Sequence, residues 1–204
     1  MRAVITGATG GIGGATAEAL GRAGYEVIIT GIDLEAGKKV IDKLESQGIK
    51  VHFYACDATN EEQVNETFAK IGEEFGSLDL LVNNVGGLGG RQRVSEMETG
   101  FMRKVMALNF DSVFFNTRAA LPLLKKGKDA SIVNFSTIAV TSGAGIGASI
   151  YAASKGAVQS YTRALAKDLP SSASAPTWSL PVPSTLPSTL RLTAPWWRAG
   201  RTAS

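Results

Sequence analysis

Tyr151 and Lys155 are the residues of this 204-residue chain whose types and spacing could support acid–base chemistry. They lie four residues apart in the run Tyr-Ala-Ala-Ser-Lys, inside a stretch with a helical pattern. Side chains at this spacing share one face of a helix. An ammonium group favours the phenolate form of a neighbouring tyrosine, so the pair could exchange a proton with a carbonyl or alcohol oxygen. An amphipathic helix with one aromatic residue on its core side would produce the same pattern, so other motifs must decide.

A glycine-rich segment follows the first apolar run and could bind phosphate. It reads Thr6-Gly7-Ala8-Thr9-Gly10-Gly11-Ile12-Gly13. The pyrophosphate of a dinucleotide needs bare backbone N–H groups and a helix N-terminus directed at it. Its spacing, Gly-x-x-x-Gly-x-Gly, differs from the commoner Gly-x-Gly-x-x-Gly. An ordinary strand–helix connection can also be glycine-rich, but the strand, turn and helix context favours nucleotide binding.

Two periodicities alternate along the chain up to about residue 169. Runs rich in β-forming residues occur at 2–6, 26–30, 50–55, 78–82 and 131–135. Helical patterns occupy 12–23, 34–47, 61–75, 98–124 and 150–169. Gly24, Gly48 and Gly76 follow three of these helices, where a left-handed residue commonly ends a helix. This alternation predicts right-handed βαβ units and an α/β fold with a doubly wound parallel sheet in three α/β/α layers.

Further motifs occur in a fixed order between the glycine-rich segment and Tyr151. They are an Asn-Asn-Val-Gly turn at 83–86, a helical asparagine at 109, and two hydroxyl residues, Ser136 and Thr137, after the fifth strand. Together with Tyr-x-x-x-Lys, this series over residues 1–169 resembles the classical short-chain dehydrogenase/reductase family. The resemblance implies a Rossmann-type domain that interconverts a ketone or aldehyde and an alcohol by hydride transfer with NAD(P)(H), without a metal.

The resemblance also assigns roles to individual residues. Tyr151 would be the acid–base group, Lys155 would hold the nicotinamide ribose, and Asn109 would support a proton relay through water. A hydroxyl from Ser136 or Thr137 would polarise the substrate. The implied cofactor-binding residues are Gly7, Thr9, Gly10, Gly11, Ile12, Gly13, Gly31, Asp33, Asp57, Ala58, Asn84, Val85, Gly86, Tyr151 and Lys155.

Two positions depart from the family pattern. The family serine lies thirteen residues before the tyrosine, where this chain has Ile138. Aligning the preceding strand places Thr137 in that slot, with one extra residue in the loop at 143–147. We favour Thr137 and keep Ser136 as the alternative. Val85 replaces the family's alanine in the Asn-Asn-Ala-Gly turn, and its second methyl could tighten the cofactor pocket.

The cofactor type depends on the end of the second strand. The family often has an aspartate there, which binds the ribose hydroxyls of NAD and repels the phosphate of NADP. The corresponding position is Gly31, which favours NADP(H) slightly over NAD(H). Asp33, two residues later, could still serve NAD(H). Asp57 and Ala58, after the third strand, match the family's adenine contact.

Composition and charge indicate which classes of binding partner to expect. The formal net charge is +3, and Arg191, Arg198 and Arg201 account for it, so the rest of the chain offers no basic face for nucleic acid. No stretch is long and apolar enough for a membrane span. The one cysteine, Cys56, fits a reducing cytoplasm as a buried apolar residue, and His52 reads as a strand residue rather than a metal ligand. We expect a small carbonyl or alcohol substrate. The resemblance implies a homodimer or homotetramer formed through the fourth and fifth helices.

Residues 170–204 differ in composition from the domain at 1–169. They hold six of the seven prolines and all three tryptophans, and neither periodicity continues. This composition predicts an irregular tail that cannot continue a sheet. A shifted reading frame from Ala173 onward permits the family's C-terminal Pro-Gly motif, so we hypothesise a frameshifted or truncated family member with low stability and little activity. The alternatives are an inactive nucleotide-binding remnant and a cofactor-sensing interaction protein.

Overall fold

The strands and helices alternate along the chain in the order that the periodicities predict. A computed structural model describes residues 1–169 and 177–179. The strands are β1 (Arg2–Thr6), β2 (Glu26–Gly31), β3 (Val51–Ala55), β4 (Leu80–Asn83), β5 (Ser131–Phe135) and β6 (Thr177–Ser179). The helices are α1 (Gly11–Arg22), α2 (Leu34–Glu45), α3 (Glu61–Phe75), α4 (Thr99–Met106), α5 (Ser112–Leu124), α6 (Ala139–Ser142) and α7 (Ser149–Asp168), with a 3-10 turn η1 (Val94–Glu96) and a π-helical segment η2 (Ala107–Asp111).

The six strands form one parallel sheet in the order β3-β2-β1-β4-β5-β6. The chain leaves β1 toward β2 and β3 on one side and then returns to place β4 on the other side. In an open α/β sheet, a ligand crevice lies outside the carboxyl ends of the strands at such a reversal. The predicted Rossmann-type doubly wound sheet is therefore confirmed.

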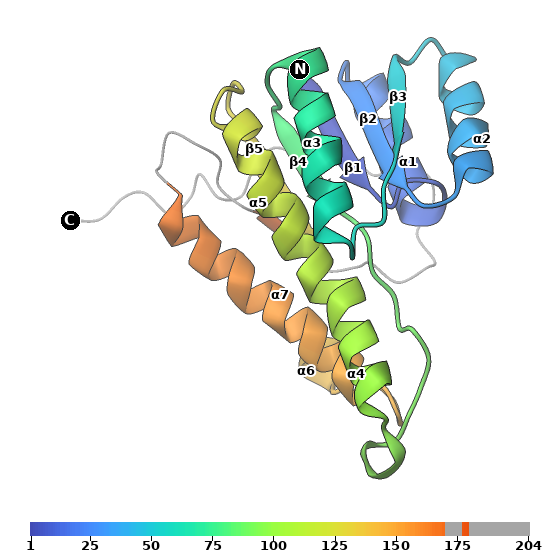
Figure 1. The fold of residues 1–204 in the computed structure, drawn as a ribbon, viewed down its shortest axis with the longest axis vertical. Helices are drawn as coiled ribbons and strands as arrows, with labels where there is room; N and C mark the ends of the chain where they lie inside the picture. The colour runs from blue at the N-terminus through green and yellow to red at the C-terminus, as the bar shows by residue number, and fades with distance from the viewer. Residues whose placement is uncertain (170–176, 180–204) are drawn as a thin grey trace.

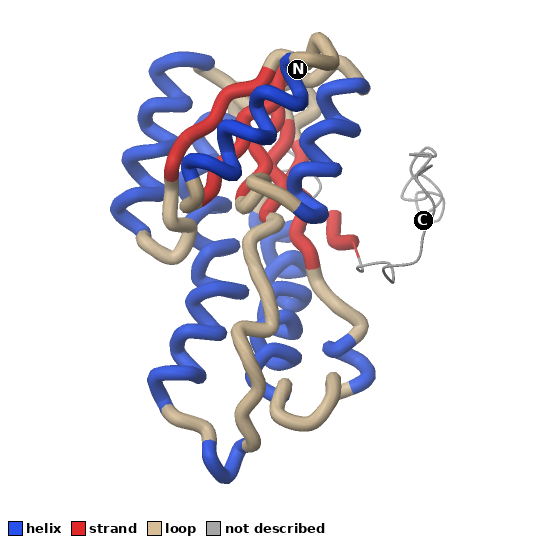
Figure 2. The backbone as a smooth tube through the Cα atoms, turned by 90° about the vertical axis from the view of Figure 1, so that its right-hand side faces the viewer, coloured by secondary structure: helices blue, strands red, loops and turns tan. Residues whose placement is uncertain are grey.

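Successive strand residues point to opposite faces of the sheet, and each face has its own core. Val4 and Ile28 pack with Val64, Phe68 and other residues from α3, α5 and α7. Their neighbours on β1 and β2 pack on the other face, with residues from α1 and α2. Helices cover both faces of the sheet, which gives the three layers visible in the two views (Figures 1 and 2).

The carboxyl ends of the strands face a separate group of elements. In Figure 1, α4, α6 and the first turns of α7 lie below the sheet, and the long loop after β4 descends to the same region. These are the segments that carry or flank the predicted catalytic residues. The fold therefore brings the glycine-rich segment and the Tyr-x-x-x-Lys motif to the same edge of the sheet.

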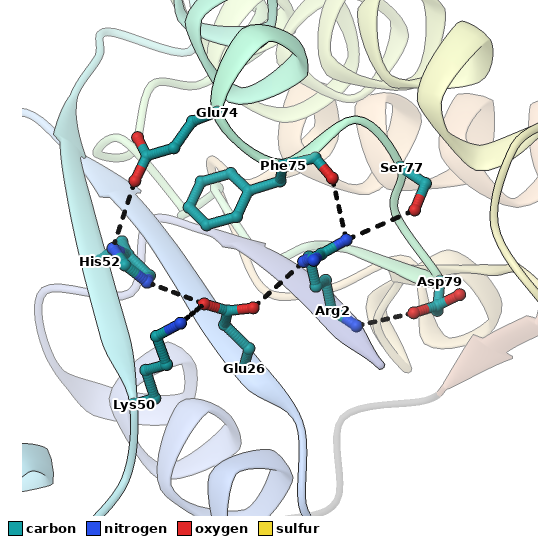
Figure 3. Close-up of polar contacts among 8 residues, drawn as sticks. All are labelled: Arg2, Glu26, Lys50, His52, Glu74, Phe75, Ser77 and Asp79. Atoms are coloured by element: carbon teal, nitrogen blue, oxygen red, sulfur yellow. Dashed lines mark hydrogen bonds and ion pairs between the residues drawn. The ribbon is translucent and has the colours of Figure 1, made fainter.

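The amino ends of the strands hold a polar network at the opposite edge (Figure 3). Glu26 accepts hydrogen bonds or ion pairs from Arg2, Lys50 and His52, at 3.1, 2.5 and 3.2 Å. The Lys50 contact is the main reason why the pKa of Glu26 falls to about 2. His52 also lies 3.8 Å from Glu74. The side chains of this network neutralise one another across three strands, and this edge is remote from the predicted site.

The predicted helix at 98–124 is helical without a break from Thr99 to Leu124, but part of its interior is π-helical rather than α-helical. The structure has α4, then the π-helical η2, then α5. Side chains take up backbone carbonyls at this point, because Asn109 Nδ2 donates to the Val105 carbonyl at 3.0 Å and Ser112 Oγ donates to the Leu108 carbonyl at 2.7 Å. A π segment of this kind is rare and often marks a functional site.

The expectation that residues beyond 170 cannot continue the sheet is wrong for residues 177–179. These three residues form β6, which pairs in parallel with β5 from Val133 to Phe135. Strand pairing uses backbone N–H and C=O groups, so the outer edge of β5 can accept an extended segment of unusual composition. The hypothesis of a frameshift from Ala173 onward, and the predicted irregular tail, otherwise concern residues 170–176 and 180–204, which lie outside the described residues.

Several smaller expectations can be compared with the structure. Gly24, Gly48 and Gly76 all have positive φ, as predicted for residues that end helices. Cys56 is buried, and burial raises the pKa of its thiol. Within residues 1–169 and 177–179, no helix is both long and apolar enough to cross a membrane, and no three His, Cys, Asp or Glu side chains are grouped to hold a metal.

Candidate active site

The glycine-rich segment connects β1 directly to α1. Gly7 and Gly11 have φ values of 63° and 54°, a left-handed region that side-chain-bearing residues rarely adopt. The residue before α1, Gly10, provides no side-chain cap, and the first turn carries no acidic residue. The first N–H groups of α1 are therefore open to an anion, and the helix dipole favours one there.

Gly13 has no room for a side chain. A Cβ atom at this position would lie 2.6 Å from Asn84 Nδ2, 2.7 Å from the Gly7 carbonyl oxygen and 2.8 Å from Ala8 Cα. The first turn of α1 therefore packs directly on the preceding loop. By contrast, a Cβ atom at Gly14 would approach only the Ala8 carbonyl oxygen, at 3.6 Å.

Asn84 holds this loop in place. Its side-chain amide donates to the carbonyl oxygens of Thr6 and Gly7, both at 3.0 Å, and its backbone N–H donates to Thr6 Oγ1 at 3.1 Å. Val85 follows it and would contact a Cβ atom at Gly7 at 2.9 Å. The turn after β4 thus supports the glycine-rich loop through the hydrogen bonds of Asn84, and Val85 packs on that loop.

The end of β2 lies beside the same loop. A Cβ atom at Gly31 would lie 2.5 Å from the methyl group of Thr9, so Thr9 fills the space that a side chain would need. Asp33 is exposed, and its Oδ1 accepts from the Ala36 N–H at 3.0 Å as the N-cap of α2. Its second carboxylate oxygen accepts no hydrogen bond from the described residues. Ile32, between Gly31 and Asp33, is 76% exposed and supplies no charge.

The loop after β3 is held by Asp57. Its Oδ1 accepts from both the backbone N–H and the hydroxyl of Thr59, at 2.9 and 2.7 Å. Its own backbone N–H donates to Gln63 at 2.9 Å. Ala58, between Asp57 and Thr59, is buried. The carboxylate is thus engaged within its own loop, at the carboxyl end of the strand next to β2.

Lys155 is the buried cation of the site. Its side chain comes from α7, and Nζ donates to the carbonyl oxygen of Phe135 at the end of β5, at 3.2 Å. The residue is 4% exposed. Burial lowers the pKa of its ammonium group to about 8. A Cβ atom at Gly86 would lie 2.8 Å from Lys155 Nζ and 2.8 Å from Asn109 Oδ1, so three chain segments converge there.

Asn109 is completely buried where these three chain segments meet. Its Oδ1 accepts from the Gly87 N–H at 3.0 Å, and its Nδ2 donates to the Gly87 carbonyl at 2.9 Å. The π-helical η2 thus anchors the loop after β4 through both groups of one amide. Asn109 Oδ1 and Lys155 Nζ both lie next to Gly86.

Tyr151 lies one turn before Lys155 on α7. Its side chain is half-buried, and its hydroxyl makes no hydrogen bond within the described part of the chain. The next residue on this side of the helix, Ser154, is buried and donates to the Tyr151 carbonyl at 2.7 Å. The phenol oxygen is therefore free to bind an external group.

Ser136 and Thr137 use their hydroxyl groups differently. Ser136 Oγ donates to the backbone carbonyl of Lys155 at 3.2 Å, so its proton is directed at α7. Thr137 Oγ1 accepts from the Ala139 N–H at 3.2 Å, which leaves its own proton available. Ile138, the residue at the family spacing from Tyr151, is 68% exposed and has no hydroxyl.

Two residues that the sequence did not single out join the loops at the mouth of the site. Arg91 Nη1 donates to the Ile146 carbonyl at 2.8 Å, and the Gln92 N–H donates to the Gly147 carbonyl at 3.0 Å. These bonds connect the loop after β4 to the loop before α7. No pattern in the sequence indicates them, because the partners lie 55 residues apart.

Comparison with known proteins agrees with this geometry. The model of the short chain dehydrogenase family matches residues 1–173. The chain belongs to this family. A curated relative, the 3beta-hydroxysteroid dehydrogenase of Mediterraneibacter gnavus, is 38% identical over 165 residues, which cover 81% of this chain and 59% of that protein. The NADP-dependent (R)-specific alcohol dehydrogenase of Lentilactobacillus kefiri is 36% identical, with 81% and 65% covered.

Solved structures of the family have the same fold. The NADH-dependent reductase A1-R', complexed with NAD, superposes with a TM-score of 0.83 and is 32% identical, with 88% of this chain and 77% of that chain covered. A metagenomic short-chain oxidoreductase in complex with NADP gives 0.82 at 27% identity, with 89% and 81% covered. The chain spans 59–66% of the length of the first curated relatives it matches.

Proposed function

We propose that this protein interconverts a ketone or aldehyde and an alcohol with NAD(P)(H), using Tyr151 as the acid–base group. The observation that carries the proposal is the buried ammonium of Lys155, one helical turn from a tyrosine whose hydroxyl has no partner among residues 1–169 and 177–179. A buried cation without a charged partner costs folding stability, and perturbed groups of this kind concentrate at active sites.

The residues present fit a dinucleotide. The open N–H groups of α1 would bind the pyrophosphate, and a Cβ atom at Gly10 or Gly11 would meet no protein atom within 4 Å, so there is free space beside the loop. Asp57 and Ala58 would lie at the adenine, Asp33 at its ribose, and Lys155 at the nicotinamide ribose. Gly86, which is exposed above Lys155 and Asn109, would leave room for the nicotinamide end.

The bound nicotinamide supplies or accepts the hydride, and the protein moves the proton. During reduction, the Tyr151 hydroxyl would donate its proton to the carbonyl oxygen, and during oxidation the phenolate would remove the proton of the alcohol. The charge of Lys155 would stabilise that phenolate. Thr137, whose proton is free, would donate a hydrogen bond to the same substrate oxygen. Asn109 would support proton relay to Lys155 from the buried side.

For the cofactor, we propose a modest preference for NADP(H). Gly31 lacks the carboxylate that would repel a 2′-phosphate, and Thr9 occupies the adjacent space. Asp33 limits this preference, because its exposed carboxylate has one oxygen free to accept from a ribose hydroxyl. A more than tenfold tighter binding of NADH than of NADPH would contradict this part of the proposal.

Family membership is also the basis for the substrate class, oligomeric state and location that we propose. We propose a small-molecule carbonyl or alcohol substrate, a homodimer or homotetramer formed through the helical segment 99–124 (α4, η2 and α5) and α7, and a cytoplasmic location. Half-buried aromatic side chains, including Phe110 on η2 and Phe114 on α5, supply apolar surface for such an interface. Nucleic acid and membrane are not among the proposed partners.

The decisive experiment measures cofactor binding and turnover separately. The 204-residue protein should quench or shift NADPH fluorescence on binding. It should also oxidise NADPH in the presence of ketones from a panel, which is measured as a loss of absorbance at 340 nm. Tyr151→Phe should lose at least about 1,000-fold in kcat while retaining cofactor affinity. Binding without turnover of any ketone would favour a nucleotide-binding protein without catalysis. Absence of binding by a folded sample would overturn the proposed function.

A further inference from the structure

A cavity of about 480 Å³ lies between two loops at the carboxyl edge of the sheet. One wall is formed by Arg93, Val94 and Ser95 after β4, and the other by residues 143–147 and Ser149 before and at the start of α7. Its volume falls in the range of small-molecule binding sites. Ser149 is two residues before Tyr151, so the cavity adjoins the helical turn that carries the proposed acid–base group.

The two walls are connected by hydrogen bonds. Arg91 donates to Ile146, and the backbone N–H of Gln92 donates to Gly147. The Gln92 side chain also accepts from the Glu98 N–H at 3.0 Å, which ties the first wall to the start of α4. A cavity whose walls are held together in this way has a defined shape for a ligand.

Much of the lining is apolar and uncovered. Val94 is 76% exposed and Ile146 is 72% exposed, one on each wall. Both are among the most exposed of the large hydrophobic side chains in the described residues. A ligand with an apolar body would cover both of them, and this burial would contribute to its affinity.

Arg93 supplies the only charge among the residues that line the cavity. Its guanidinium makes no ion pair or hydrogen bond with any described residue, whereas Arg22 and Arg118 each pair with a glutamate. Glu96 and Glu98 follow within five residues, but neither lines the cavity. A free guanidinium beside an apolar cavity matches a carboxylate, which it can bind through two parallel hydrogen bonds.

We propose that the substrate of this enzyme is an anionic carbonyl compound, with an apolar body in this cavity and a carboxylate on Arg93. This inference rests on the proposed function, because the carbonyl group must reach Tyr151 while the carboxylate reaches Arg93. The distance between Tyr151 and Arg93 then determines which substrate length is preferred.

The test uses methyl ketones with a terminal carboxylate, CH3CO(CH2)nCO2⁻, with n from 2 to 8, and their methyl esters. In the wild-type protein, at least one acid should have a kcat/KM about tenfold or more above that of its ester, mainly through KM. Arg93→Gln should abolish this difference, Arg93→Lys should retain part of it, and Arg93→Glu should reverse it. Lys126→Gln, which removes one positive charge at the other edge of the sheet, is the matched control and should leave the difference intact.

A second readout does not depend on turnover. Saturation-transfer NMR on the Tyr151→Phe variant with NADPH should detect the preferred acid and show that Arg93→Gln weakens its binding. Turnover of the esters and acids at equal kcat/KM, or a preference for acids that survives Arg93→Gln, would overturn this inference and leave the proposed function standing. Failure of cofactor binding would remove the proposed function itself. If cofactor binds but no ketone is turned over, the NMR comparison of acid with ester decides the inference alone.

Discussion

Lys155 Nζ lies 3.2 Å from the backbone carbonyl oxygen of Phe135, and this is its one hydrogen bond to the described residues. A single neutral partner does not compensate for the burial of an ammonium group. The pKa of Lys155 accordingly falls from 10.5 to about 8. The site therefore holds its cation at a cost in folding stability, which has a measurable pH dependence.

Replacing Lys155 with methionine should stabilise the cofactor-free protein at pH 7 by roughly 1–3 kcal/mol while abolishing turnover. Because the folded-state pKa is lowered, the unfolded chain binds more protons between about pH 8 and 10.5, and the cost of Lys155 diminishes as the pH rises through that window. Urea unfolding of both proteins at pH 7 and pH 10 measures this difference. An equal gain at the two pH values would contradict the burial argument.

Thr137 and Ser136 should differ in their effect on catalysis. Thr137→Val keeps the side-chain shape but removes the donor, and should lower kcat about 100-fold, whereas Thr137→Ser should retain most activity. Ser136→Ala removes a hydrogen bond to the Lys155 carbonyl. It should cost about 1 kcal/mol of stability and less than tenfold in kcat. The opposite ranking in steady-state kinetics would make Ser136 the substrate-polarising residue.

Gly13 and Gly14 provide a matched pair for the phosphate-binding loop. Gly13→Ala would place a Cβ atom 2.6 Å from Asn84 Nδ2, so the loop must move and NADPH affinity should fall at least about tenfold. Gly14→Ala meets only one atom, at 3.6 Å, and should bind NADPH like the wild type. Fluorescence titration, with circular dichroism to confirm folding, measures both. Equal affinities would mean that the loop accommodates the Gly13→Ala methyl group without moving the groups that bind the cofactor.

Asp33 should control cofactor choice. Asp33→Asn retains an oxygen that can cap α2 at the Ala36 N–H but removes the negative charge beside a 2′-phosphate. The ratio of the NADH and NADPH dissociation constants should therefore move about tenfold toward NADPH, which corresponds to ~1.4 kcal/mol. Glu35→Gln, an exposed neutralisation two residues away, is the control. A ratio unchanged in Asp33→Asn would place the selector elsewhere.

Glu26 should stabilise the sheet at its amino edge. Glu26→Gln removes the partner of Arg2, Lys50 and His52, and should lower the free energy of unfolding at pH 7 by ~1–2 kcal/mol. Since the folded-state pKa of Glu26 is lowered to about 2, its contribution is present above about pH 4.5 and is lost as the pH falls toward 2. Wild type and variant should therefore converge in stability at acidic pH. Divergence on acidification would contradict this assignment.

The sequence alone determined the layered α/β architecture and most element boundaries. The bounds of β1, α3 and β5 match the predicted ranges 2–6, 61–75 and 131–135, because periodicity, caps and glycines act locally. The order of short motifs also determined the family and the candidate residues Tyr151 and Lys155. These features need no knowledge of how distant segments meet.

The tertiary structure decided the features that depend on contacts between distant segments. It showed that the long helix contains the π-helical segment η2, that residues 177–179 pair with β5, and that Asn84 holds the glycine-rich loop. It also separated the two hydroxyls, because Ser136 donates to α7 whereas Thr137 keeps its proton free. Arg93 could be recognised as an unpaired cation only when the loops at 91–97 and 143–149 were placed side by side. Hydrogen bonds between residues far apart in the chain are set by the packing of the whole fold, and no local pattern encodes them.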